Sequence, residues 1–104
     1  MNRFKPFNAM PPMTRLLIET FGISFASARL EQKLALIESV GFLMREESQN
    51  LGYALLIIVP NVEMPENLLS ANNIKLASLR EGLTLLALLY GSVNKEIPAA
   101  VFEE

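Results

Sequence analysis

The sequence predicts an α+β domain with a small antiparallel sheet and two helices. Two observations support this prediction: apolar runs that glycines or prolines bracket, such as Tyr53–Val59, and turn-forming residues between the runs. A chain of 104 residues is the size of one ordinary domain, and its 51% apolar residues can form a core. We therefore expect a single domain over residues 13–104, preceded by an extended N-terminal arm over residues 1–12.

A short helix is the first element that the sequence predicts after the arm. Three of the six prolines of the chain lie within residues 1–12, and they favour extended backbone there. Thr14 can then cap a helix over Arg15–Phe21, and Gly22 can end it. This helix is one of the two that the sequence predicts.

The middle of the chain is predicted to form three strands joined by tight hairpins. The three strands are Lys33–Ile37, Phe42–Glu47 and Tyr53–Val59. Gly41 and Gly52 argue against one long helix, because each costs about 1 kcal/mol relative to alanine, and Ser48–Asn50 is typical of a turn. A helical period is an alternative that remains open, and it can be traced through Leu30, Leu34, Ile37 and Met44.

The last third of the chain is predicted to contain a helix and a further strand. The helix covers Glu66–Ser78, and the strand covers Leu83–Tyr90 between Gly82 and Gly91. Leucine and alanine favour a helix in this second segment, so strand and helix are both considered there, with strand preferred. Val93–Ile97 would return beside this strand as a hairpin.

The predicted strands need cover on both faces. Alternate residues of a strand face opposite sides of a sheet, and both sides of Tyr53–Val59 and of Leu83–Tyr90 are apolar. Two helices cover about one face of a small sheet. We therefore expect a homodimer, with a segment of another protein as the next choice for the uncovered face.

The residue types exclude most enzymatic chemistry. The chain contains no histidine, cysteine or aspartate, so it offers no ordinary catalytic triad and no typical zinc or iron site. Glu46 and Glu47 are adjacent and would point to opposite faces of a strand, which rules out a paired-carboxylate site. We expect a non-enzymatic protein without cofactor or metal, whose partner-binding residues the sequence does not identify.

The sequence also bears on location. The longest apolar run, Tyr53–Val59, is far shorter than the roughly 20 residues needed to cross a bilayer. The first residues lack the apolar stretch of a signal peptide. A cytoplasmic protein is therefore expected.

A winged-helix DNA-binding protein is an alternative interpretation. Phe25–Ser39 would be the recognition helix, Gly41–Val59 the wing, and Arg29 and Lys33 would face DNA. The net charge of −2 and two glutamates on the same helix argue against it, because phosphate contacts dominate DNA affinity. A second alternative is a small helical protein with an oligomeric interaction role, of the immunity or anti-activator type.

The element order over about residues 13–98 resembles that of class I type III secretion chaperones. A short helix precedes three strands, and Pro65 leads into Leu68-Leu69-Ser70-Ala71-Asn72, which looks like the Leu-Leu-x-x-Asn helix of the family. A small and polar step over Ala77–Gly82 then enters an apolar segment. The chain departs from the family in having no aspartate and in having Glu81-Gly82 where the family often has two glycines.

This resemblance implies a bacterial, cytoplasmic homodimer without cofactor that binds effector-like segments through hydrophobic patches and strand addition. It also implies a dimer interface at the positions that match the second helix of the family and a following strand. These positions are Leu68, Leu69, Asn72, Leu76 and Leu85.

Overall fold

The computed structural model describes residues 9–97, and within them the chain is built from helices, without a strand. The helices are α2 (Pro12–Phe21), α3 (Leu30–Arg45), α4 (Leu51–Ile58), α5 (Glu66–Leu69) and α6 (Leu79–Glu96). The prediction of an α+β domain with an antiparallel sheet was therefore wrong. Each predicted strand has become helical over most of its length, including Leu83–Tyr90, for which helix was the second choice.

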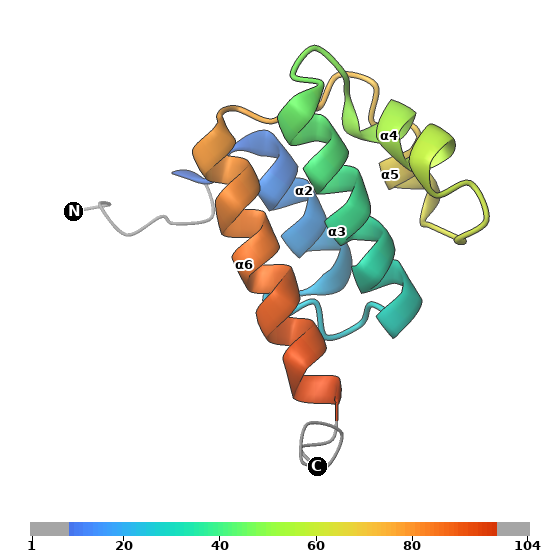
Figure 1. Cartoon of the computed structure of the whole chain (residues 1–104), viewed down its shortest axis with the longest axis vertical. Coiled ribbons are helices and arrows are strands. Elements are labelled where there is room, and N and C mark those ends of the chain that lie inside the picture. The colour runs from blue at the N-terminus through green and yellow to red at the C-terminus, as the bar shows by residue number, and fades with distance from the viewer. Residues whose placement is uncertain (1–8, 98–104) are drawn as a thin grey trace.

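Three helices form the body of the molecule, and a smaller unit flanks it. Helices α3 and α6 run in opposite directions in close contact, and α2 lies behind them in the view of Figure 1. Helix α4 packs on α3, and α5 packs on α4. The buried core contains residues from every described helix; its largest side chains with almost no exposed surface include Met13, Leu17, Phe25, Leu36, Leu43, Leu51, Leu55, Leu68, Leu85 and Leu89.

Helix α2 confirms the first predicted element. It begins at Pro12, whose fixed φ suits the first turn of a helix, and it ends at Phe21 before Gly22. Gly22 has a φ of 93°, a conformation that favours glycine, and its N–H donates to the carbonyl of Ile18. The predicted cap, Thr14, lies inside the helix, and Pro11 is the N-cap. Of the predicted arm, residues 1–8 lie outside the described residues.

Helix α4 was predicted as a strand because Tyr53–Val59 is apolar throughout and rich in β-branched residues. Asn50, expected in a turn, instead caps a helix: its side chain accepts a hydrogen bond from the backbone N–H of Tyr53 at 2.8 Å. Two further N–H groups at the start of α4, those of Leu51 and Gly52, donate to the carbonyls of Ile74 and Ala71 at 2.8 and 3.2 Å. Hydrogen bonds to a distant part of the chain therefore satisfy backbone N–H groups at the start of α4.

Those two bonds also explain why the predicted helix Glu66–Ser78 ends early. Only Glu66–Leu69 is helical, because the following backbone is used to cover the start of α4. A Cβ atom placed on Gly52 would lie 2.6 Å from the carbonyl oxygen of Leu69. The absence of a side chain at position 52 is what lets this segment approach so closely.

Helix α6 runs through Gly82 and Gly91, which were taken to bracket a strand. Ser78 caps it, and its side chain accepts from the N–H of Glu81 at 3.2 Å. A Cβ atom on Gly82 would lie 2.6 Å from the side chain of Met44, so this glycine makes room for α3. Gly82 therefore lies inside the helix because of its packing against α3, whereas the prediction took it as the boundary of a strand.

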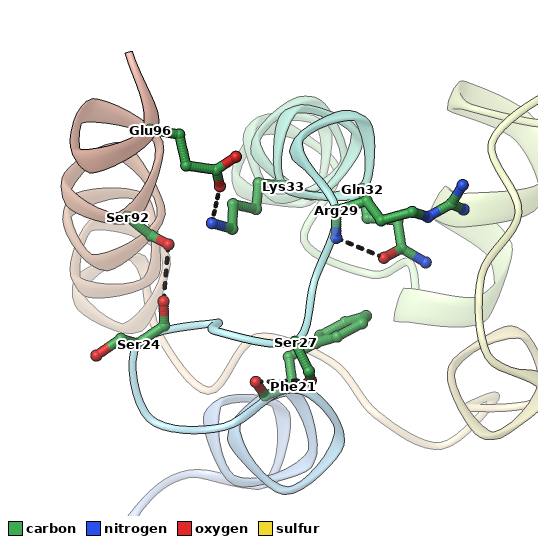
Figure 2. A network of polar contacts seen from close by, with 8 residues as sticks. All are labelled: Phe21, Ser24, Ser27, Arg29, Gln32, Lys33, Ser92 and Glu96. Atoms are coloured by element: carbon green, nitrogen blue, oxygen red, sulfur yellow. Dashed lines mark hydrogen bonds and ion pairs between the residues drawn. The ribbon is translucent and has the colours of Figure 1, made fainter. Parts of the chain in front are cut away.

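The loop between α2 and α3 is fixed to α6 by polar contacts (Figure 2). The Ser92 hydroxyl of α6 donates to the backbone carbonyl of Ser24 at 2.7 Å. Buried Lys33 of α3 forms an ion pair with Glu96 near the end of α6. This pair joins the first turn of α3 to the last turn of α6, as expected for antiparallel helices.

Candidate protein-interaction surfaces

The residues predicted for a dimer interface are divided between the core and the surface. Leu68 and Leu85 have 0% of their surface exposed and belong to the chain's own core. Leu69 and Leu76 are half-buried against that core, while Asn72 is exposed. Leu68, Leu69 and Asn72 lie together in and after α5, and Leu85 lies in the separate helix α6. This predicted interface stays a prediction, but two of its five residues offer no surface to a partner.

A larger apolar surface lies where α3 and α6 meet, on the side opposite α2. We call it the α3/α6 face. The side chains that form it are Leu30, Leu34 and Ile37 with Gly41 on α3, and Leu79, Leu83, Leu86 and Tyr90 on α6. Leu83 and Tyr90 are 59% and 55% exposed, so a large part of this apolar area faces solvent in the single chain.

Both rows of this face follow the spacing of a helix-bundle seam. Successive members are four, three and four residues apart on each helix, which keeps them on one side of the helix axis. Neither row contains a charged residue; by helical geometry Glu38 and Arg45 lie at the outer margin. A Cβ atom on Gly41 would meet nothing within 4 Å, so the face has an open site among larger side chains.

Helix α4 carries a second, smaller apolar patch. Tyr53, Leu56 and Ile57 are exposed there, and the ring of Tyr53 lies 6.2 Å from that of Phe42. The helix has only 8 residues, so this patch presents a single short row rather than two long ones.

A groove between α2 and α6 is the third feature of the surface, and we call it the α2/α6 groove. It consists of two hollows of about 370 and 220 Å³ that both contact Leu88. Met10, Ile18 and Thr84 line the larger hollow, and Ile23 and Gly91 line the smaller. The groove therefore follows much of the length of α6.

Buried Glu81 connects α2 and α6 at the larger hollow of this groove. One of its carboxylate oxygens accepts from the backbone N–H and the hydroxyl of Thr14, at 3.0 and 2.8 Å. The other accepts from the backbone N–H of Ala77 at 2.6 Å. One carboxylate thus lies at the positive N-terminal ends of both α2 and α6, and it fixes the two helices relative to each other.

Of the two residues proposed for DNA contact, Lys33 is buried and Arg29 is exposed. Lys33 is 4% exposed and paired with Glu96, and Arg29 forms an ion pair with Glu31 at 2.9 Å. The connection between α2 and α3 spans residues 22–29, longer than the 3–4 residues typical of a helix-turn-helix. In the described part of the chain, Gly41–Val59 forms no strand that could act as a wing.

Residues 9–97 show neither a metal site nor a membrane-spanning helix. Residues 9–97 hold no group of three metal-ligating side chains, and none of their helices is long and apolar enough to cross a membrane. Comparisons with protein-family models, with curated proteins and with solved structures give no match for this chain. The surfaces of the molecule are therefore the features that bear on its function.

Proposed function

We propose that this chain is a non-enzymatic helical interaction protein that acts as a homodimer through its α3/α6 face. The observation that supports this proposal is the pair of uncharged rows on two antiparallel helices, in which five of the eight positions are exposed apolar side chains. The largest apolar patch on a soluble protein is often a functional contact surface. The strand-addition mechanism is not retained, because it requires a sheet edge and residues 9–97 contain no strand.

A second copy is the partner that suits this face best. Two antiparallel helices with seam spacing form half of a four-helix bundle, and a two-fold axis in the plane of the face would supply the other half. A large side chain of the partner would occupy the open site beside Gly41. The same face on both copies makes the contact self-complementary.

The face is small, so we expect a contact of modest strength. From Leu30 to Gly41 and from Leu79 to Tyr90, each row rises by about 16 Å at 1.5 Å per residue, and the two helix axes lie about 8–10 Å apart. The strip between the axes therefore covers roughly 130–170 Å² on each copy, and an interface confined to it would be smaller than the roughly 1,200–2,000 Å² of standard specific interfaces. We therefore expect a weak homodimer whose interface consists mainly of leucine side chains.

We place this dimer in the cytoplasm and among small helical proteins whose role is to bind other proteins, as immunity proteins and anti-activators do. The absence of cysteine suits a reducing compartment. The wholly helical described region and the burial of Lys33 favour this class over a winged-helix protein.

Sedimentation equilibrium of wild type, Leu83→Glu and Leu56→Glu tests the proposal. Leu83 and Leu56 are 59% and 54% exposed, so a charge at either position disturbs the folded monomer to a similar small degree. We expect dimers for wild type and Leu56→Glu and a monomer for Leu83→Glu, because dimerisation would bury that carboxylate without a partner. A monomeric wild type at high micromolar concentration, or dissociation caused only by Leu56→Glu, would contradict the proposal.

A further inference from the structure

The α2/α6 groove lies outside the proposed dimer interface. On α6, the seam row of Leu83 and Tyr90 and the groove residues Thr84 and Leu88 point to different sides of the helix, since neighbouring residues are about 100° apart. Arg80 and Lys95 line its two hollows, one at each end. A dimer formed through the α3/α6 face would therefore keep this groove open to solvent.

Contacts at both ends hold the groove in shape. The Glu81 carboxylate joins α2 to α6 at one end, through Thr14 at 2.8 and 3.0 Å. The Ser92 hydroxyl holds the loop after α2 at the other end, at 2.7 Å from the Ser24 carbonyl oxygen. A ligand would not have to organise the groove, which lowers the cost of binding.

The length and the lining of the groove match a helix. From Arg80 to Lys95, α6 rises by about 22 Å at 1.5 Å per residue, which corresponds to about four helical turns. Ile18, Ile23 and Leu88 supply apolar contacts along this length. Around Gly91 a Cβ atom would meet nothing within 4 Å, so another backbone can approach closely there.

The charged side chains at the edge of the groove indicate which kind of partner it can bind. Arg80 and Lys95 lie at the ends of the groove, and Arg15 lies one turn after Pro11, which lines it. None of these three cations forms an ion pair within residues 9–97. The acidic residue that lines the groove, Glu81 of α6, is buried, and its carboxylate accepts hydrogen bonds from the chain itself; the acidic residue of α2 is Glu19.

We infer that the α2/α6 groove binds one amphipathic helix of a partner protein, with an apolar face for the floor and acidic residues for the rim. This assignment rests on the proposed interaction role, and it names the kind of partner. A concave groove of about four turns suits a helix better than it suits a flat lipid surface. The partner's carboxylates would pair with Arg15, Arg80 and Lys95.

The test uses the full chain and a displayed library of four-turn amphipathic peptides, with a leucine row and a randomised polar face. We expect selection to enrich glutamate and aspartate on the polar face. Fluorescence anisotropy with a selected peptide should show affinity lost in Leu88→Glu and weakened about tenfold or more in the double variant Arg80→Glu, Lys95→Glu. Raising salt from about 0.05 to 0.5 M should weaken binding as well.

Three results would overturn the inference. One is enrichment of basic or neutral polar faces, or of no peptide at all. Another is binding that survives Leu88→Glu but is lost in the matched surface variant Leu56→Glu. The third is binding of the protein to vesicles of phosphatidylserine and phosphatidylcholine that Leu88→Glu abolishes, which would assign the groove to a lipid surface.

The variant Leu83→Glu separates this inference from the proposed homodimer. It should be monomeric and still bind the acidic peptide with near-wild-type affinity. A wild-type monomer that binds the peptide through Leu88 would refute the homodimer and retain the groove. A wild-type dimer for which no acidic peptide is selected would refute the groove and retain the homodimer.

Discussion

The side of α6 that borders α3 and the side that borders α2 differ in both shape and charge. Toward α3, the exposed residues form an uncharged row that includes Leu83 and Tyr90. Toward α2, Leu88 lies in a hollow whose two ends carry Arg80 and Lys95. One helix thus presents a surface suited to an identical copy and another suited to a different, acidic partner. Burial explains neither difference, since both sides are exposed; side-chain size and charge do.

The largest expected effect is on the free energy of unfolding, and it distinguishes the buried side of α6 from its exposed sides. Leu85→Ala should lower the free energy of unfolding by about 2–5 kcal/mol, because it empties space in the core where Leu85 is 0% exposed. Leu83→Ala should cost less than about 1 kcal/mol in the monomer. Urea denaturation at concentrations low enough to keep the protein monomeric measures both. Equal losses would mean that Leu83 is packed like a core residue.

The sequence already contained signals for two of the helices that were predicted as strands. Ser78-Leu79-Arg80-Glu81 has the pattern of a capping box, and Asn50 is a favoured N-cap ahead of Tyr53. The prediction instead took the glycines as boundaries of strands. Gly52 and Gly82 instead allow close packing against Leu69 and Met44, a tertiary requirement that no local pattern reports. Helix α2 was predictable because Gly22 supplies a local stop.

The surfaces were less predictable than the helices. The helical period through Leu30, Leu34 and Ile37 is visible in the sequence, but the period does not tell which side of α3 faces the core. Position 36 lies between two of these residues and is fully buried, whereas Leu34 is exposed. Apolar residues on more than one side of α3 and α6 made core and surface indistinguishable. The expectation of a homodimer came from strands that would be apolar on both faces. Residues 9–97 contain no strand, so that reasoning no longer supports it, and the homodimer stays a prediction.

An intermediate effect concerns the groove side. Glu81→Gln should lower the free energy of unfolding by about 1–3 kcal/mol, because an amide cannot accept all the bonds from Thr14 and Ala77 and carries no charge at the two helix ends. Thermal denaturation followed by circular dichroism checks this. Glu38→Gln, at an exposed position on α3, is the matched control and should change stability little. Identical melting temperatures for both variants would contradict the assigned role of Glu81.

The smallest effect compares two glycines with open surroundings. Gly41→Ala and Gly91→Ala should each raise helix stability by about 0.5–1 kcal/mol, since nothing lies within 4 Å of the added Cβ in the single chain. Only Gly41→Ala should weaken the dimer, by about tenfold, because the added methyl group takes space reserved for a partner side chain. Sedimentation equilibrium measures both dissociation constants. Equal constants would show that Gly41 lies outside the contact.

Intermolecular nuclear Overhauser effects in a mixed dimer test the central claim most directly. One half of the sample carries isotope labels and the other half does not, so that filtered spectra report only contacts between copies. The account predicts such contacts for Leu34, Leu83 and Tyr90, and none for Leu56 or Ile57 of α4. Contacts confined to the α4 residues, or a spectrum without intermolecular contacts at high micromolar concentration, would contradict it.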